Sequence, residues 1–193
     1  MFTIIILIVV AFLAGFIDAI VGGGGLLQTP AGLMAFPNES VASVIGSLKI
    51  PSFTGAFISS RQYLKKSPIP IKRILLLGSI AFSAAFLGSW VLTKVSNQFF
   101  KPMIFFVLIL IAIYTYTKKN LGLSQAFENN QFPYIKGIII ALVLGFYDGF
   151  IGPGAGSILV LLFISQMGFD FMRANAHAKI INVSTNLGSI TLF

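Results

Sequence analysis

The sequence predicts an all-α polytopic membrane protein built from two pseudosymmetric helical repeats with glycine-rich broken helices, the second repeat being incomplete. Two observations lead to this prediction. The first is composition: 56% of the 193 residues are hydrophobic and only 9% are charged, with a mean hydropathy of +0.95. Soluble domains carry about a quarter charged residues. The apolar residues form long blocks, and blocks of about 20 are typical of membrane-spanning helices.

The second observation is an internal repeat at an offset of 130 residues, from Gly15 to Gly145. The stretch GFIDAIVGGGGLLQTP in the first copy is matched by GFYDGFIGPGAGSILV in the second, and Lys49 falls on Lys179 without a gap. Self-similarity at a fixed distance predicts a duplicated unit. We therefore expect a first transmembrane repeat at 1–117, a polar linker at 118–133 and a second transmembrane repeat at 134–193.

The elements of the first repeat are set by glycine, proline and charge. The glycines at 22–25 end the first apolar block, because consecutive glycines destabilise a helix. The next apolar piece, of about 11 residues, is too short to cross a membrane on its own. Pro37 ends it, and Ser40 precedes the next helix. The predicted helices are 2–21, 26–36, 41–63, 71–94 and 102–117.

The second repeat follows the same order over a shorter distance. It begins with a helix at 134–151, continues through a Gly/Pro break at 152–156 and a short piece at 157–166, and ends with a helix from Phe171. Phe193 corresponds to Tyr63, so counterparts of the helices at 71–94 and 102–117 are absent. We expect a piece of a longer protein; the alternative is a natural short form that a partner subunit completes.

The orientation of the repeats depends on what happens at each break. If each break is the tip of a helical hairpin, a repeat has an odd number of helical pieces and the second copy lies inverted. If each break only kinks a continuous span, the repeats are parallel. We favour inverted repeats, because transporters place broken helices of opposed halves at a midplane site. Basic residues in the loops at 61–73 and 118–136 predict that both loops face the cytoplasm.

The two breaks predict a binding site. Non-helical backbone at membrane depth is tolerated where it is covered by protein or lines a cavity, and paired breaks indicate a site. The free N–H groups expected at Leu26 and Ser157, together with the helix dipoles, suit an anion. The alternative is that the glycines only permit tight helix packing. The candidate glycines are Gly22, Gly23, Gly24, Gly25, Gly152, Gly154 and Gly156.

Lys49 and Lys179 each lie about eight residues, or about 12 Å, into a predicted span. A buried ammonium group is expensive and usually serves a polar cavity or a counter-charge. The alternative is that each side chain snorkels to the nearer interface. The matched positions favour two substrate-binding cations in a central cavity. Ser52 and its counterpart Asn182 are expected to line that cavity, with Gln28, Ser47, Asn175 and Asn186 as further polar candidates.

Asp18 and Asp148 end the first helix of each repeat. They could relay protons, pair with a lysine, or accept hydrogen bonds from the N–H groups of the break, and the last is the favoured interpretation. His177 precedes Lys179 by two residues, on a different face of that helix. A lone histidine is more often a structural residue than a proton carrier, so His177 is a secondary candidate.

An enzyme is not predicted, and neither a metal site nor a cofactor is expected. There are no cysteines and no metal-ligand cluster, and the glycine-rich stretch at 152–156 is not followed by the Lys-Ser/Thr of a phosphate loop. Tyr147-Asp148 resembles half of an intramembrane aspartyl protease, and Ser157 with His177 a serine protease, but both lack the rest of the motif. The net charge of +8 sits in short loops, so no nucleic-acid partner is expected.

The two glycine-rich motifs, together with the Ala176-x-Ala178-Lys179-Ile180-x-Asn182 run, resemble the sulfite exporter TauE/SafE (TSUP) family of membrane transporters. Members of that family complete the second repeat. The resemblance implies secondary transport, most simply export, of small sulfur-containing or organic anions, such as sulfite or sulfoacetate. It also implies a multi-pass protein of the prokaryotic inner membrane.

The resulting hypothesis is alternating access, in which one repeat rocks against the other around an anion held by Lys49, Lys179 and the backbone of both breaks. The alternatives are a non-transporting membrane scaffold or assembly subunit, and a passive anion channel. The expected partners are a small anionic substrate and the lipid bilayer. The sequence leaves open a homo-oligomer, the substrate, the direction of transport and the coupling ion.

Overall fold

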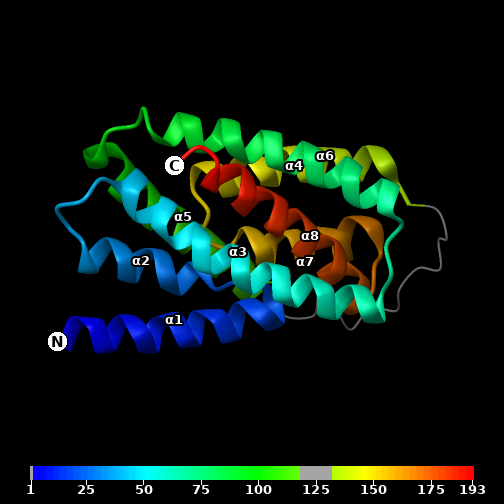
Figure 1. The fold of residues 1–193 in the computed structure, drawn as a ribbon, viewed down its shortest axis with the longest axis horizontal. Coiled ribbons are helices and arrows are strands. Elements are labelled where there is room, and N and C mark those ends of the chain that lie inside the picture. The colour runs from blue at the N-terminus through cyan, green and yellow to red at the C-terminus, as the bar shows by residue number, and fades with distance from the viewer. Residues whose placement is uncertain (1, 118–131) are drawn as a thin grey trace.

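The computed structural model describes residues 2–117 and 132–193, and all regular structure in these residues is α-helical (Figure 1). The all-α prediction is therefore confirmed. The predicted linker at 118–133, with its basic residues Lys118 and Lys119, lies almost wholly outside the described residues. The helices are α1 Phe2–Val21, α2 Gly25–Ala35, α3 Val41–Lys66, α4 Ile71–Leu92, α5 Asn97–Thr117, α6 Tyr134–Phe150, α7 Ala155–Met167 and α8 Phe171–Ile190.

The starts of α3 and α8 are fixed by side-chain caps. The Ser40 hydroxyl accepts a hydrogen bond from the Ser43 N–H at 3.0 Å, and the Asp170 carboxylate accepts one from the Arg173 N–H at 2.8 Å. Such caps satisfy one of the N–H groups that a helix start leaves unpaired. Asp170 follows Ser40 by 130 residues, so the two caps stand at positions that the predicted repeat pairs.

The predicted start of α5 at residue 102 is wrong, because the helix begins at Asn97. Pro102 lies inside the helix, where it removes a backbone hydrogen bond without ending the helix. Polar residues precede this proline, so the hydropathy pattern placed the start of the helix too late in the sequence. The Asn97 side chain accepts a hydrogen bond from the Val41 N–H at 3.0 Å, which ties the start of α5 to the start of α3.

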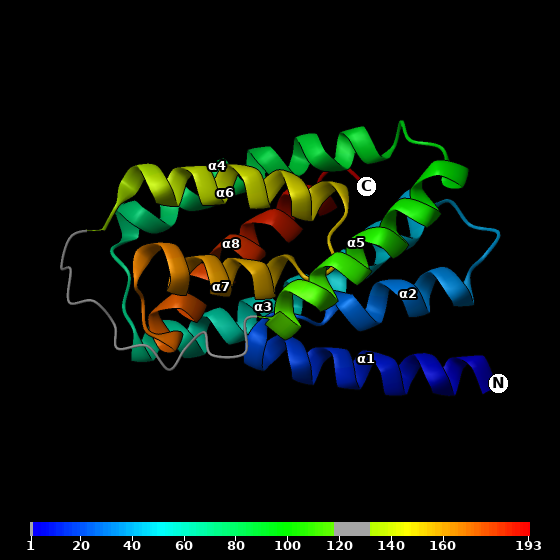
Figure 2. The ribbon, with the colours of Figure 1, turned by 180° about the vertical axis from the view of Figure 1, so that it is seen from behind.

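The chain reverses direction at both glycine-rich breaks. In Figures 1 and 2, α2 runs back alongside α1, and α7 runs back from the end of α6. Each break is therefore the tip of a hairpin, not a kink in a continuous span. The same views show that α1, α2 and α3 run in the opposite directions to α6, α7 and α8, respectively.

Small residues let α4 and α6 pack closely. A Cβ atom added at Gly149 would lie 2.1 Å from the Ala85 carbonyl oxygen, and one added at Gly88 would lie 2.3 Å from the Phe146 carbonyl oxygen. The Ser89 hydroxyl donates to the Gly149 carbonyl at 3.0 Å across the same interface. Only small side chains fit between these two backbones, so the small residues of α4 and α6 allow the helices to approach closely.

The outer surface of the bundle is apolar. Large hydrophobic side chains are exposed on α1, α4, α5 and α6, among them Phe12, Phe106 and Ile135. Within the described residues, α3 and α4 are long and apolar enough to cross a membrane, and residues 4–20, 97–111 and 155–167 form shorter apolar helices. Exposed apolar helices of this kind are expected where lipid, not water, is the solvent.

Basic residues gather at one end of the bundle. The end of α3 and the starts of α4, α6 and α8 lie together at that end, whereas the connection between α2 and α3, which contains Glu39, lies at the other (Figure 1). These helix ends carry Lys65, Lys66, Lys72, Arg73, Lys136 and Arg173.

Candidate functional site

The two breaks meet in the interior, where their backbones touch. A Cβ atom at Gly22 would lie 2.7 Å from the Gly156 carbonyl carbon, and one at Gly156 would lie 2.1 Å from the Gly22 carbonyl oxygen. Gly22, Gly152 and Gly154 also have positive φ angles of 75°, 90° and 77°. Such angles strain other residues, so both the space and the backbone conformation require glycine here.

Two buried lysines join the two halves of the chain in reciprocal fashion. The Lys49 Nζ on α3 donates to the Asp148 Oδ1 at 2.9 Å and to the Asp148 carbonyl at 2.6 Å, at the end of α6. The Lys179 Nζ on α8 donates to the Asp18 Oδ2 at 2.9 Å and to the Asp18 carbonyl, near the end of α1. Each third helix therefore reaches across to the first helix of the other half.

These lysines do not snorkel to an interface. The Lys179 side chain is fully buried and that of Lys49 is 6% exposed. A buried ammonium needs a counter-charge and further hydrogen-bond partners. Each lysine finds both in one aspartate, whose carboxylate supplies the charge and whose backbone carbonyl supplies a second acceptor. Three roles were considered for the aspartates: relaying protons, pairing with a lysine, and accepting hydrogen bonds from the break. In the structure, both aspartates pair with a lysine.

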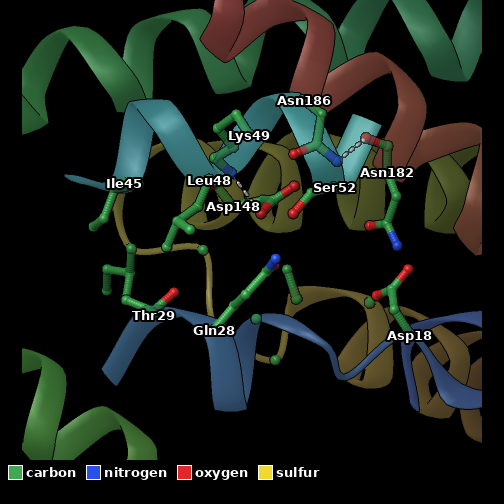
Figure 3. Close-up of a pocket in the computed structure, with 17 residues that line it drawn as sticks. Asp18, Gln28, Thr29, Ile45, Leu48, Lys49, Ser52, Asp148, Asn182 and Asn186 are labelled. Atoms are coloured by element: carbon green, nitrogen blue, oxygen red, sulfur yellow. Dashed lines mark hydrogen bonds and ion pairs between the residues drawn. The ribbon is translucent and has the colours of Figure 1, made fainter. Parts of the chain in front are cut away.

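A small polar pocket of about 50 Å³ lies between the crossed pairs (Figure 3). Gln28 of α2 points into it from one side, and Ser52 of α3 faces it from the other, beside the Lys49–Asp148 pair. Asn182 and Asn186 of α8 complete the polar wall, with the Asn186 amide donating to the Asn182 carbonyl at 2.7 Å. The breaks supply Gly22, Gly25, Gly152, Gly154 and Gly156.

The pocket contains most of the predicted site residues but not all of them. Lys49, Ser52, Asn182, Asp18 and Asp148 line it together with five of the candidate glycines. Gly23 and Gly24 do not line it, and Lys179 lies behind Asp18 with no exposed surface.

His177 lies away from the pocket, in an aromatic cluster on the far part of α8. Its ring centroid is 5.4 Å from that of Phe132, 5.3 Å from Phe163 and 5.0 Å from Phe169. Its Nδ1 is 2.8 Å from the Arg173 carbonyl oxygen, one helical turn earlier. These contacts favour the structural role over the proton-carrying role for this histidine.

The backbone at the starts of α2 and α7 is less open than expected. The Leu26 N–H, expected to be free, donates to the Gly23 carbonyl at 3.0 Å. In the second break the Ala155 N–H donates to the Gly152 carbonyl at 3.2 Å, whereas the Ser157 N–H, the other group expected to be free, has no hydrogen-bond partner among the described residues. At the start of each short helix, a carbonyl group of the preceding break therefore accepts a hydrogen bond from one N–H group of the first turn. That N–H group is no longer free to bind an anion.

Sequence reasoning missed five lining residues, namely Thr29, Ile45, Leu48, Ile151 and Ala155. Thr29 follows Gln28 in a short helix that is otherwise apolar, and it is buried. That adjacent polar pair was the available signal. No feature of the sequence marks Ile45 or Leu48 as a lining residue, because apolar residues occur on every face of a membrane helix.

Comparisons with known proteins match the chain to membrane transporters. A family model described as Sulfite exporter TauE/SafE matches residues 7–193. A "Probable membrane transporter protein" of Haemophilus influenzae is 36% identical over 188 residues, which are 97% of this chain and 72% of the relative. "Probable membrane transporter protein ORF9" of Sinorhizobium sp is 33% identical over 187 residues, 97% and 70% of the two chains.

"Probable membrane transporter protein YfcA" of Escherichia coli strain K12 is 33% identical over 192 residues, which are 97% of this chain and 69% of the relative. No solved structure matches the chain.

Proposed function

Because the chain belongs to the sulfite exporter TauE/SafE family, we propose that it is a secondary transporter of small sulfur-containing or organic anions, such as sulfite or sulfoacetate. We place it in the prokaryotic inner membrane as a multi-pass protein that exports its substrate. The observation on which the site depends is the reciprocal pairing of two buried lysines with two aspartates around a small pocket.

We propose inverted repeats as the basis of the mechanism. The opposite directions of α1–α3 and α6–α8 support this arrangement (Figures 1 and 2). So does the exchange of partners: Lys49 pairs with Asp148, and Lys179, at the equivalent position, pairs with Asp18. An approximate two-fold relation between the halves would generate this exchange, since each contact then has a counterpart with the roles reversed.

The same pairs support alternating access as the mechanism. Both pairs bridge the two halves, so rocking one half against the other must stretch or re-form them. An anion in the pocket offers Lys49 a second negative partner in place of the Asp148 carboxylate. The anion would thereby lower the free energy of the intermediate in which a pair is open, which is the differential binding that a transport cycle needs.

The size of the pocket favours the smaller candidate substrates. Its volume is about 50 Å³, whereas a water molecule needs about 10–15 Å³ by this kind of measure. Sulfite, with four heavy atoms, matches that space, and sulfoacetate requires a wider conformation. The polar wall of Gln28, Ser52 and Asn182 offers amide and hydroxyl donors for the oxygen atoms of such an anion.

Sulfite flux into proteoliposomes tests this function. We expect saturable flux in the wild-type protein, and Lys49→Gln and Lys179→Gln should each reduce it at least tenfold, because about 1.4 kcal/mol of lost binding is a factor of ten. Lys72→Gln is the matched control, since Lys72 is exposed at the start of α4, far along the bundle from the pocket.

Folded protein is verified for each variant by size-exclusion chromatography. Absence of saturable flux for sulfite, sulfoacetate and acetate through well-folded wild-type protein would reject the transporter, and the scaffold interpretation would then lead. Flux that rises linearly without saturation would favour the passive channel.

A further inference from the structure

The two lysine–aspartate pairs differ in the hydrogen-bond partner of the carboxylate oxygen that the lysine does not bind. The Thr185 hydroxyl donates to the Asp148 Oδ2, so that carboxylate is bound by Lys49 on one oxygen and by a hydroxyl on the other. The position equivalent to Thr185 in the first half is Gly55, which has no side chain. The second oxygen of Asp18 is left with the Gly24 N–H, at 3.4 Å, as its partner among the described residues.

The two carboxylates also differ in their access to water. The Asp18 side chain is 23% exposed, compared with 8% for Asp148. Asp18 lines the central pocket and also a neighbouring cavity of about 120 Å³, which Gly55 borders as well. A cavity of this size can hold several water molecules where polar groups are present. Asp18 is therefore the carboxylate that can exchange a proton with water.

The charges at the site sum to zero, because two lysines face two aspartates. An anion that enters adds a negative charge to a poorly solvated region, which is unfavourable. Protonation of one aspartate removes this excess. It also leaves the ammonium of its partner without a counter-charge, and a buried ammonium in that condition favours the arrival of an anion. Proton and anion binding should therefore be mutually favourable.

We propose that Asp18 is the proton-accepting carboxylate of the transporter and that the anion crosses the membrane together with a proton, outward or inward as the sum of the anion and proton gradients dictates. A proton from water in the side cavity adds to the Asp18 carboxylate and forms the neutral acid. Lys179 keeps its own proton, and a monoanion in the pocket compensates the charge that Asp18 no longer balances. Release of the anion on the other side lets the proton leave and the Lys179–Asp18 pair re-form.

The titratable groups that face Asp18 are few among the described residues. Lys179 approaches from α8. Tyr63 approaches from α3, and its hydroxyl donates to the Ala19 carbonyl at 3.1 Å. The Lys49–Asp148 pair lies across the pocket. The inference rests on the proposed transport function and adds the coupling ion and the residue that binds it.

The test measures sulfite and proton movement together in proteoliposomes that contain a trapped pH-sensitive dye. With an acidic exterior, the wild-type protein should accumulate sulfite, and the interior should acidify in proportion to the sulfite that enters, above the level of protein-free liposomes. In Asp18→Asn, accumulation driven by the pH gradient should fall to the protein-free level, and any remaining sulfite exchange should lose its dependence on pH.

Gly55 offers a matched pair of variants that leaves Asp18 intact. A Cβ atom at Gly55 meets nothing within 4 Å, so Gly55→Ala should fold and behave like the wild type. Gly55→Asn adds an amide that extends further into the side cavity than a hydroxyl would, toward the second oxygen of Asp18. A hydrogen bond from the amide N–H favours the ionised carboxylate, so the pH of half-maximal flux should shift by about one unit to the acid side. Sulfite itself titrates near neutral pH, but equally in both variants.

The outcomes separate this inference from the proposed function. Sulfite flux without proton movement, or full pH-driven accumulation in Asp18→Asn, overturns the role of Asp18 and leaves the transporter in place. Absence of saturable sulfite flux in the wild type overturns both. If Asp18→Asn does not fold, the Gly55 pair decides: an acid shift in Gly55→Asn supports the inference, and profiles that match those of Gly55→Ala overturn it.

Discussion

At the scale of single residues, the free energy of the site depends most on two buried ion pairs, Lys49–Asp148 and Lys179–Asp18. Lys49 is 5% exposed and Lys179 is fully buried, so neither ammonium can recover its hydration. Each is held by the carboxylate and the backbone carbonyl of one aspartate. Such pairs add little net stability over an apolar pair, but removing one partner leaves the other buried and uncompensated.

This reasoning predicts strong coupling between Lys49 and Asp148. Asp148→Asn should lower the free energy of unfolding by about 3–5 kcal/mol, because it leaves a buried ammonium without its counter-charge. Adding Lys49→Met to that variant should restore most of the loss, because the uncompensated charge is then gone. Thermal unfolding of the purified protein in detergent measures both variants and the Lys49→Met single variant that completes the cycle. Costs that simply add in the double variant would contradict the pairing.

At the scale of the elements, glycines decide how closely the helices pack. The contact between α4 and α6 allows no Cβ at Gly149, where it would lie 2.1 Å from the Ala85 carbonyl oxygen. A Cβ atom added at Gly15, on α1, would have no other atom within 4 Å. Glycines at helical positions therefore fall into two classes, which the sequence alone does not separate.

The two classes should respond in opposite ways to alanine. Gly149→Ala should destabilise the protein by about 1–3 kcal/mol, because the added methyl group forces α4 and α6 apart. Gly15→Ala should leave stability unchanged or raise it by up to about 1 kcal/mol, because alanine is the better helix former and space is available. The midpoint temperature of unfolding in detergent compares the two variants. A similar loss in both would show that Gly15 packs against something in the membrane-embedded protein.

At the scale of the whole molecule, the distribution of charge predicts the orientation in the membrane. The end of α3 and the starts of α4, α6 and α8 share one end of the bundle (Figure 1) and carry six basic residues, whereas the other end carries Glu39 and two basic residues, Lys94 and Lys101. Lysine and arginine in short loops favour the cytoplasmic side. The basic end is therefore expected in the cytoplasm.

Single cysteines can test this orientation, because the sequence contains none. In intact cells, a membrane-impermeant maleimide should label Glu39→Cys and should label Lys66→Cys only after the cells are broken. Lys66 and Glu39 are both exposed, so both thiols are accessible on their own side. Labelling of Lys66→Cys in intact cells would reverse the assignment of the two ends.

The sequence by itself determined the helical class, the positions of both breaks and the identity of the two lysines, because hydropathy, glycine runs and a fixed offset are local or periodic features. Only the tertiary structure decided that Lys49 binds Asp148 and Lys179 binds Asp18, across separations of 99 and 161 residues. It also placed Lys179 behind the pocket and His177 outside it. Such contacts depend on how helices cross, which side-chain packing sets and which a one-dimensional pattern does not record.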